Sequence, residues 1–530
     1  MKKMTWKMRL LGGLVAVSML FAGCAQGVDD ETFEAGVTNA QLESPVLSED
    51  SFGVVTDVVT GNEVIQVTWP VVVGAEGYKL SATKTGRWTQ GALQPVTPEP
   101  VMFGESTEKE VEGCSTTFPA EYGCEYEVTI LTIGNKKLNN KDAEEATLYK
   151  YLYYTPPVMI PAVDKNGNPT ALDKVIPTYF DPARPKSRAV FLLEPEATYY
   201  INGDLSFAYH EVQIYPAVWN EAKGDYDEVA THATVVFGAD EEAGTEGAIY
   251  TATGLTLRSL NIDCSKMKAD GLILMESKLT DVPLAPAGGL MYCDKPIAIQ
   301  SCWIKELKSS IFNVNTGAWG IKEFRLEDSI VQLYFDGATE KHTFINAHCA
   351  GVGLVNGVKE ASWYGGILNT YILNSTIFNR CKGSDMSNKN YFIRFSNKDL
   401  SKVFNTYEGV FDLKNCTVSR MVTKKDFANN MPNKTPWVYT FENSVFYDVY
   451  RLQKIKQGGT NASKKETNTT WGVTNSVDNT DKNEFATVED PGFTDANLNA
   501  ILDFSKPNGG VNFKATGTIS STIGDPRWLK

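Results

Sequence analysis

A six-residue phrase recurs along the second half of the chain, with apolar side chains at its ends and polar, bend-forming side chains between them. The first position is a large apolar residue, the second is polar, the third is Ser, Asp or Asn, and the sixth is apolar in all but the last copy. The copies occupy residues 257–262, 299–304, 326–331, 373–378, 413–418, 441–446 and, in degenerate form, 473–478. Because Ser, Asn and Asp side chains hydrogen-bond the backbone at bends, each copy predicts a strand, a sharp bend and a second strand.

The repeat predicts a stacked architecture, because a single copy cannot bury its own apolar face and neighbouring copies can bury it together. The first positions of successive copies are 42, 27, 47, 40, 28 and 32 residues apart. The shorter spacings fit one coil of a parallel β-helix, and the longer ones leave room for inserted loops or an extra coil. Helical periodicity is weak in this region. A β-sandwich with many similar strands is the alternative, and the scarcity of Asn-Gly hairpin signals disfavours it.

Shorter alternating segments precede the repeat and predict a small β-sandwich over residues 44–155. Three of them, 64–69, 77–82 and 126–131, alternate between apolar and polar side chains. An early strand ending in Trp69, a Gly-Tyr strand and a late Tyr-x-Val-x-Ile strand resemble a fibronectin type III module, in which Tyr126 would be the corner tyrosine. Trp69 is then expected in the core of the module rather than in contact with a ligand.

The N-terminus has the pattern of a bacterial lipoprotein signal. Basic residues precede an apolar run at 10–22, which is too short to span a bilayer comfortably, and the sequence LFAGC follows at 20–24. These small residues before a cysteine resemble a lipobox, which implies cleavage before Cys24 and lipidation of that residue. A signal peptide with a coincidental cysteine is the alternative. The acidic run at 29–31 resembles the surface-export signal of lipoproteins in glycan-foraging Gram-negative bacteria, so we expect an outer-membrane, surface-exposed location. A solvated linker without a signal is the alternative for this run.

Composition narrows the functions that the chain can have. Of 530 residues, 50 are Lys or Arg and 64 are Asp or Glu, so the net charge is 50 − 64 = −14, which argues against a general nucleic-acid binder. With four His and no CxxC pair, a zinc site is not expected. Cys302 and Cys416 occupy the same repeat position and are predicted to be small stacked residues rather than reactive thiols. Cys114 and Cys124 are ten residues apart, and either a disulfide or two thiols would fit an exported protein.

Both ends of the repeat region resemble a known fold family. Residues 190–201 resemble the first coil of pectate-lyase-like β-helices. Residues 490–493, 502–504 and 524–528 resemble the closing segment of β-helix surface lipoproteins from bacterial polysaccharide-utilisation systems, some of which are domains of unknown function. The resemblance implies an all-β chain in which a fibronectin III-like sandwich precedes a right-handed parallel β-helix. The expected division is a signal peptide at 1–23, a tether at 24–43, the sandwich at 44–155, a linker at 156–188, the β-helix at 189–480 and its closing segment at 481–530.

The resemblance also implies a polysaccharide groove on one parallel face, walled by loops that leave the coils. Residues 380–398 contain five Lys or Arg and one acid, in an otherwise acidic protein. This pattern suits a uronate-rich chain, because Arg can bind a carboxylate through two hydrogen bonds. A solvated basic face, and rings that merely cap the coils, are the alternatives. The aromatic residues that could stack on sugar rings are Trp363, Tyr364 and Tyr391.

A lyase would need three groups for β-elimination: a base, a group that neutralises the uronate carboxylate, and a proton donor for the leaving oxygen. Either Ca²⁺ or an Arg can neutralise the carboxylate in a lyase, and Asp385 is the candidate ligand if Ca²⁺ is used. No cofactor is assigned otherwise. No paired-carboxylate phrase for glycoside hydrolysis stands out. The candidates for the base and the carboxylate clamp are Lys382, Lys389, Arg380 and Arg394.

These observations favour a surface-anchored lipoprotein that binds a polysaccharide, of a uronate-rich kind if the basic loop takes part, and holds it for partner proteins of a glycan-uptake system. The first alternative is a polysaccharide lyase of pectate-lyase-like fold, so whether the chain is an enzyme stays open. The second alternative is a structural or adhesin-like surface protein, which would bind no glycan. In each case the lipid anchor alone reaches the membrane, and no nucleic acid is expected as a partner.

Overall fold

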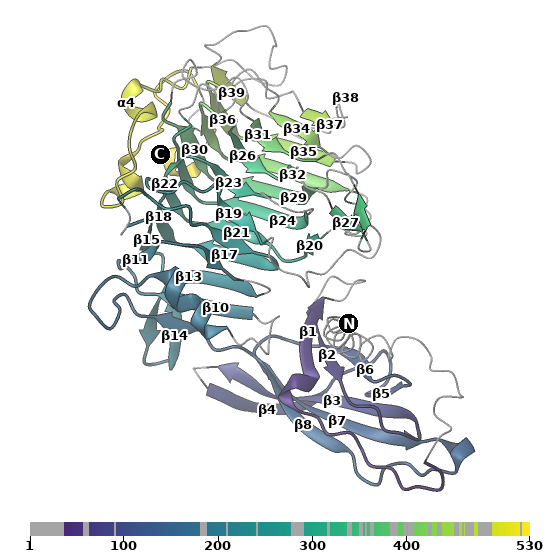
Figure 1. Ribbon diagram of the computed structural model, residues 1–530. Coiled ribbons are helices and arrows are strands. Elements are labelled where there is room, and N and C mark those ends of the chain that lie inside the picture. The colour runs from purple at the N-terminus through teal and green to yellow at the C-terminus, as the bar shows by residue number, and fades with distance from the viewer. Residues whose placement is uncertain are drawn as a thin grey trace, which may run out of the picture. The chain divides into compact units, whose positions relative to one another are not determined.

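The structure is a computed structural model of the chain, and it divides into two compact units built mainly from strands (Figure 1). The first unit comprises Met1–Thr155 with Trp219–Tyr226, and the second comprises Pro156–Val218 with Asp227–Lys530. The residues that the structure describes are 37–56, 63–89, 92–180, 188–207, 210–239, 242–276, 291–314, 319–335, 342–348, 353–355, 358–360, 365–381, 391–396, 400, 408–421, 427–431, 437–449, 455–457, 460–461, 471–474, 490–519 and 522–529.

The second unit is a parallel β-helix, as the repeat predicts. Each coil contributes one strand in turn to three long sheets, and the strands of successive coils run parallel within a sheet (Figure 1). One coil consists of β17 (Gly254–Arg258), β18 (Leu260–Asp263) and β19 (Gly271–Met275). They pair with β21 (Ile297–Gln300), β22 (Trp303–Leu307) and β23 (Ser310–Asn313) of the next coil. The predicted all-β fold with a parallel β-helix is therefore confirmed.

The three sheets are numbered in the order in which a coil visits them. Sheet 1 contains β9 (Val158–Ile160), β10 (Arg188–Leu193), β13 (Glu211–Asn220), β14 (Asp225–Glu228), β17, β20 (Met291–Cys293), β21, β24 (Trp319–Glu327), β29 (Gly365–Leu373), β32 (Gly409–Lys414) and β35 (Trp437–Glu442). Sheet 2 contains β11 (Thr198–Ile201), β15 (Ala233–Phe237), β18, β22, β25 (Ile330–Leu333), β30 (Thr376–Asn379), β33 (Thr417–Ser419), β36 (Ser444–Tyr447) and β39 (Trp471–Thr474). Sheet 3 contains β12 (Leu205–Ser206), β16 (Ile249–Thr251), β19, β23, β26 (Thr343–Asn346), β31 (Tyr391–Arg394), β34 (Ala428–Met431), β37 (Ile455–Gln457) and β38 (Thr460–Asn461).

A single residue with left-handed backbone separates sheet 1 from sheet 2 in the repeat copies. Asn and Asp adopt this conformation more readily than most residues with a side chain. The third position of the phrase therefore holds bend-forming residues because the backbone reverses its hand there. The φ angles are 52° at Ser259, 52° at Ser301, 48° at Asp328, 49° at Asn374, 54° at Asn415 and 46° at Asn443.

The sequence pattern predicts that the fourth copy of the repeat begins at Leu373, which is one residue later than in the structure. The left-handed residue is Asn374 and not Ser375. The first position accordingly belongs to Ile372, which pairs with Leu326 of the preceding coil. Leu373 imitates a first position because it is apolar and polar residues follow it. The pairing between coils, and not the local pattern, decides the register here.

The degenerate last copy also has a different place from the one predicted. Val473 of β39 pairs with Phe446 of β36, so it lies after the bend and corresponds to the sixth position of the phrase. The prediction that Val473 opens a copy is therefore wrong. The residues of that phrase beyond Thr474 lie outside the described residues.

Small side chains at the fourth position form a ladder along the bends. Ser329, Ser375 and Ser444 each donate a hydroxyl hydrogen bond to the backbone oxygen two residues earlier, at 2.7, 2.7 and 2.8 Å. Cys302 and Cys416 take the same place, and their sulfur atoms lie 3.2 and 3.1 Å from the equivalent oxygens. Burial raises the pKa of both thiols to about 12. These cysteines are therefore small, buried members of the ladder, as the repeat predicts.

The outer face of sheet 2 is covered by the chain itself. The described residues 490–529 include α4 (Asp495–Leu498), η6 (Pro507–Gly510) and η7 (Pro526–Trp528). Their apolar side chains form a second core outside the coil interior. The C-terminal segment therefore occupies the outer face of sheet 2 around β25 and β30. The residues of this second core include Leu498, Leu502, Val511, Phe513 and Trp528 from the C-terminal segment, with Ile330 and Phe378 from sheet 2.

The first unit is a β-sandwich of two antiparallel sheets. Trp69 is buried in its core, where its ring meets that of Tyr78 edge to face at 5.4 Å. The Tyr126 hydroxyl accepts a hydrogen bond from the Glu121 N–H at 2.8 Å, which is the kind of backbone contact that a corner tyrosine makes. One sheet contains β1 (Phe52–Thr56), β2 (Glu63–Thr68) and β6 (Ser115–Pro119), and the other contains β3 (Ala75–Thr89), β4 (Ala92–Pro100), β5 (Glu108–Val111), β7 (Cys124–Gly134) and β8 (Thr147–Tyr153).

The cysteines of the sandwich do not form the disulfide that the sequence allowed. The Cys114 sulfur lies 4.0 Å from the Tyr78 hydroxyl, and the Cys124 sulfur lies 3.9 Å from the Glu121 carboxylate. Cys114 lies just before β6 of one sheet, and Cys124 opens β7 of the other sheet. Each thiol therefore contacts the side chain named here and not the other thiol.

The remaining elements are short. Within the described part of the chain, no helix is long and apolar enough to cross a membrane. The short elements are η2 (Glu49–Ser51), η3 (Lys136–Leu138), α2 (Leu172–Val175), η4 (Ile176–Tyr179) and the hairpin of β27 (Gly353–Val355) with β28 (Val358–Glu360).

Candidate functional site

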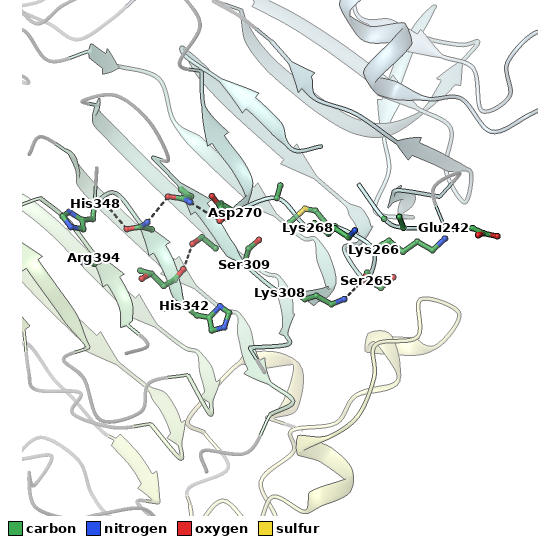
Figure 2. Close-up of a pocket in the computed structure, with 18 residues that line it drawn as sticks. Glu242, Ser265, Lys266, Lys268, Asp270, Lys308, Ser309, His342, His348 and Arg394 are labelled. Carbon is green, nitrogen blue, oxygen red and sulfur yellow. Dashed lines mark hydrogen bonds between the residues drawn. The ribbon is translucent and has the colours of Figure 1, made fainter. Parts of the chain in front are cut away.

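A groove of about 880 Å³ lies along sheet 3 and is the candidate binding site (Figure 2). Its walls come from the segments that connect sheet 2 to sheet 3 in successive coils, and from the ends of β23, β26 and β31. Of the described residues that line this groove, four carry a cationic side chain and two carry a carboxylate, although the protein has a net charge of −14. The charged lining residues are Lys266, Lys268, Lys308, Arg394, Glu242 and Asp270, and His342 and His348 join them.

The connection between β18 and β19 presents Lys266 and Lys268 to the groove. Met267 lies between them, is only 1% exposed, and forms a β-bridge with Thr245. The Thr245 N–H donates to the Lys266 oxygen at 3.0 Å, and the Lys268 N–H donates to the Thr245 oxygen at 2.8 Å. Because side chains alternate along extended backbone, the burial of Met267 turns both lysines to the opposite side.

Lys308 stands one coil further on, in the connection that enters β23. Its Nζ donates a hydrogen bond to the backbone oxygen of Ser265 at 2.8 Å, which holds its ammonium group against the preceding coil. Ser309 beside it also lines the groove, and its buried hydroxyl has no hydrogen-bond partner among the described residues. Lys266, Lys268 and Lys308 together form what we call the lysine group.

Side-chain amides form a row between the lysine group and Arg394. Asn313 Nδ2 donates to the backbone oxygen of Asp270 at 3.1 Å, and Asn346 Nδ2 donates to Asn313 Oδ1 at 2.9 Å (Figure 2). Asn313 pairs with Asn346 across β23 and β26, and Asn346 pairs with Arg394 of β31. Each amide carries a second donor hydrogen and further acceptor capacity, so the row can bind the hydroxyl groups of a ligand.

The guanidinium group of Arg394 ends this row and is half buried. It lies 5.6 Å from the centre of the Tyr391 ring, and burial lowers its pKa below the ordinary arginine value. No carboxylate among the described residues pairs with it, and its buried Nε has no hydrogen-bond partner there. The described arginines that do pair with a carboxylate in this unit are Arg188, Arg258, Arg325, Arg380, Arg420 and Arg527.

The difference between Arg394 and the arginines that pair with a carboxylate bears on the function of Arg394. Removing a cation from water without a counter-charge is unfavourable, so a half-buried guanidinium that has no acid partner in the described part of the chain gains no stability from a pair there. The same arrangement suits a bidentate contact with a carboxylate or a similar anion from outside the protein. Arg394 is therefore the residue of the groove best prepared for an anionic group.

The structure brings Arg394 to the groove, with Tyr391 beside it, but it places Arg380 elsewhere. Arg380 follows a strand of sheet 2, pairs with the Glu306 carboxylate and lies 5.2 Å from the centre of the Tyr334 ring. It is not among the residues that line the groove. The other predicted site residues lie outside the described residues: Lys382, Lys389, Asp385, Trp363, Tyr364 and Cys24.

The sequence analysis did not identify the lysine group, although the repeat contains a signal for it. Lys266 follows the sixth position of the first copy, Ile262, by four residues, and Lys308 follows the sixth position of the second copy, Ile304, by the same number. The sixth position lies in sheet 2, so this offset carries both lysines into the connection with sheet 3. The sequence predicts the site in a long loop instead, because the basic residues of 380–398 stand close together in sequence.

The groove also holds an imidazole ring beside the arginine. His348 lines it, and its Nδ1 lies 3.2 Å from the Ser396 hydroxyl oxygen. No group of three or more His, Cys, Asp or Glu within the described ranges is arranged to hold a metal ion. The described residues of the groove can thus bind anions and hydroxyl groups.

Comparisons with known proteins add little to this site. A family model described as a domain of unknown function, DUF4992, matches residues 3–159. No curated protein sequence matches the chain. Among solved structures, the chain is similar to the catalytic unit of a thermostable GH87 alpha-1,3-glucanase from Streptomyces thermodiastaticus strain HF3-3, with 12% identity over 84% of this chain and 94% of that chain. The TM-score is 0.12, which is too low to support a functional conclusion.

Proposed function

We propose that this protein is a surface lipoprotein that binds an anionic polysaccharide, of the uronate-rich class, along the groove of sheet 3. The observation that carries the proposal is the excess of cationic over anionic side chains among the described residues that line this groove, which runs against the net charge of −14. An acidic protein repels polyanions in general, so a local positive groove is the place where one can bind.

The chemistry of the lining supports this ligand class. Arg394 has the fork of donors that fits a carboxylate, and the lysine group supplies ammonium charges. The amide row of Asn313 and Asn346 is suited to sugar hydroxyls. A groove that joins charge contacts to hydroxyl contacts fits an acidic sugar chain better than a simple anion or a neutral glycan.

The lipid anchor completes the proposal. The lipobox-like sequence before Cys24 would attach the chain to a membrane, and the acidic tether behind it would allow export to the cell surface. A protein held there could keep a bound polysaccharide near partner proteins of a glycan-uptake system.

Calorimetric titration of the full chain tests the binding proposal. We expect heat of binding with polygalacturonate, a weaker signal as salt is raised because exposed charges are screened, and no signal with neutral dextran. Equal binding to dextran would show that charge plays no part. If polygalacturonate, alginate and hyaluronan all fail to bind, the proposal is wrong and the adhesin-like alternative gains.

Polysaccharide lyase activity is the second candidate, and the presence of His348 close to Arg394 in the groove favours it (Figure 2). The arginine would neutralise the uronate carboxylate while a neighbouring base removes the proton next to it. Incubation with the same polysaccharides and Ca²⁺ tests this, because β-elimination creates an unsaturated product that absorbs ultraviolet light. Binding without any such product would leave a binding protein.

A further inference from the structure

The cationic side chains of the groove fall into two separate sets, which bears on the length and charge of the ligand. Arg394 ends β31, whereas Lys308 precedes β23 and Lys268 precedes β19. The strands of sheet 3 follow one another in the order β19, β23, β26, β31. Lys308 is therefore two strands away from Arg394, and Lys268 is three strands away.

Strand spacing converts this order into a distance along the β-helix. Neighbouring strands lie about 4.8 Å apart, so the two sets are separated by about 10–14 Å along the axis. The intervening row consists of neutral amides, Asn313 and Asn346. A single acidic sugar cannot touch both sets at once, whereas a chain that crosses the strands can.

The two sets also differ in chemistry. Arg394 offers a planar fork and has no carboxylate partner among the described residues. The lysine group offers compact charges next to Asp270, which offsets part of their charge. Neither set alone is a strong site for an anion, but both together can bind one polyanion, because the second contact forms within a molecule that is already bound.

We infer that the groove selects a linear chain carrying at least two acidic groups, one on Arg394 and one on the lysine group, and that this chain lies across the strands of sheet 3. The inference rests on the proposed function and makes it narrower. It excludes short acidic sugars and chains with one acidic residue as good ligands.

A length series of galacturonate oligomers with one, two, four and eight residues tests the inference, with binding measured by calorimetry on the full chain. We expect the affinity to rise at least about tenfold between the dimer and the octamer, because the second charged contact becomes reachable. An octamer with its carboxylates reduced to alcohols should bind no better than dextran. An octamer that binds no more tightly than the dimer would overturn the inference.

Substitutions test whether the gain in affinity with oligomer length depends on both sets of cationic side chains. In the K268A/K308A double variant, the octamer should lose its gain in affinity. It should then bind about as weakly as the dimer binds the unaltered protein. A dimer bound at Arg394 should be unaffected by this variant. The R394A variant should also lose the gain. Lys414, which pairs with Asp412 on sheet 1 at 2.9 Å, supplies the control variant K414A, which should keep the full gain.

The failure of this inference is distinguishable from the failure of the proposed function. If the octamer binds but the K268A/K308A variant keeps the full length dependence, the proposed function stands and the inference is wrong. If the octamer and the long polymer do not bind at all, the proposed function itself fails. Thermal unfolding of each variant shows whether the chain still folds, and K268R/K308R, which keeps both charges, should bind like the unaltered protein.

Discussion

The guanidinium group of Arg527 donates a hydrogen bond to the backbone oxygen of Asp328 at 2.7 Å, although 199 residues separate the two in sequence. It also donates to the backbone oxygens of Ser329 and Asn374, each at 2.8 Å. Asp328 and Asn374 are the left-handed bend residues of neighbouring coils. The end of the chain therefore fastens the bends of two coils to each other.

The Arg527 contacts predict a large stabilising effect. In R527A, three backbone oxygens lose a donor, and the fully buried carboxylate of Asp525 loses its cation. We expect the free energy of unfolding in urea to fall by about 3–5 kcal/mol, as for other broken buried pairs. The matched control is K506A, which breaks an exposed pair with Asp503 and should leave the free energy of unfolding almost unchanged. Equal effects of the two variants would contradict the fastening role.

The ladder at the fourth repeat position predicts that Ser375 can be replaced by cysteine but not by alanine. The Ser375 hydroxyl donates to the Leu373 oxygen at 2.7 Å and accepts from the Ser329 N–H at 3.1 Å. Alanine removes both contacts and leaves the Ser329 N–H without this acceptor, while the Leu373 oxygen still accepts from the Asp328 N–H at 3.1 Å. S375A should therefore lower the free energy of unfolding by about 1–3 kcal/mol. S375C should lose less, because Cys416 already occupies this position in the next copy. A cysteine variant as unstable as the alanine variant would argue against the ladder.

The buried thiols predict a slow reaction with alkylating reagents. Burial raises the pKa of Cys302 and of Cys416 to about 12. At pH 8, only about one molecule in ten thousand then carries the reactive thiolate at either position. Iodoacetamide should therefore leave both residues unmodified in the native protein and modify them in denaturant, as peptide mass spectrometry would reveal. Rapid modification of either residue in the native protein would contradict their burial.

Arg394 has no carboxylate partner among the described residues, which predicts that its removal affects binding and not stability. R394A should weaken the binding of polygalacturonate about tenfold, since a charged hydrogen-bonded contact is lost. Its free energy of unfolding should stay the same or rise, because the half-buried charge has no acid partner among the described residues. Arg325 supplies the contrast, since it pairs with Glu323 and Glu327 and lies 4.6 Å from the centre of the Tyr371 ring. R325A should lose about 1 kcal/mol of stability and bind normally.

The lipobox-like sequence predicts that Cys24 carries a lipid. In a bacterial host that processes lipoproteins, C24S should move the protein from the detergent phase to the aqueous phase of a Triton X-114 partition, because the acyl chains provide its membrane affinity. The neighbouring substitution A25S should leave the partition unchanged. A C24S chain that still enters the detergent phase would show that the anchor lies elsewhere.

Local sequence was sufficient to predict the β-helix because its bends are made by single residues. Ser259 and Asp328 each reverse the hand of the backbone within the phrase that contains them, so the pattern of strand, bend and strand is visible without any partner. The register of a copy is different. Leu373 looks like a first position, and only the pairing of Leu326 with Ile372 in the adjacent coil corrects it.

The same distinction between local sequence and pairing in space applies to the binding site. The sequence alone identified an acidic chain with a basic loop and picked out Arg394 as a candidate for binding a carboxylate. Arg380 looked equivalent, yet Glu306 neutralises it from a strand-end position 74 residues earlier, while Arg394 reaches the groove of sheet 3. Lys266 and Lys308 looked unremarkable, because 42 residues separate them in sequence.

Bends and strands are thus encoded by neighbours in sequence, whereas the pairing of charges is decided by neighbours in space. A stacked coil brings residues about 4.8 Å apart that lie tens of positions away along the chain. Whether an arginine is neutralised or left for a ligand depends on that stacking. The fold of this protein therefore follows from its repeat, and the identity of its binding residues follows from the alignment of its coils.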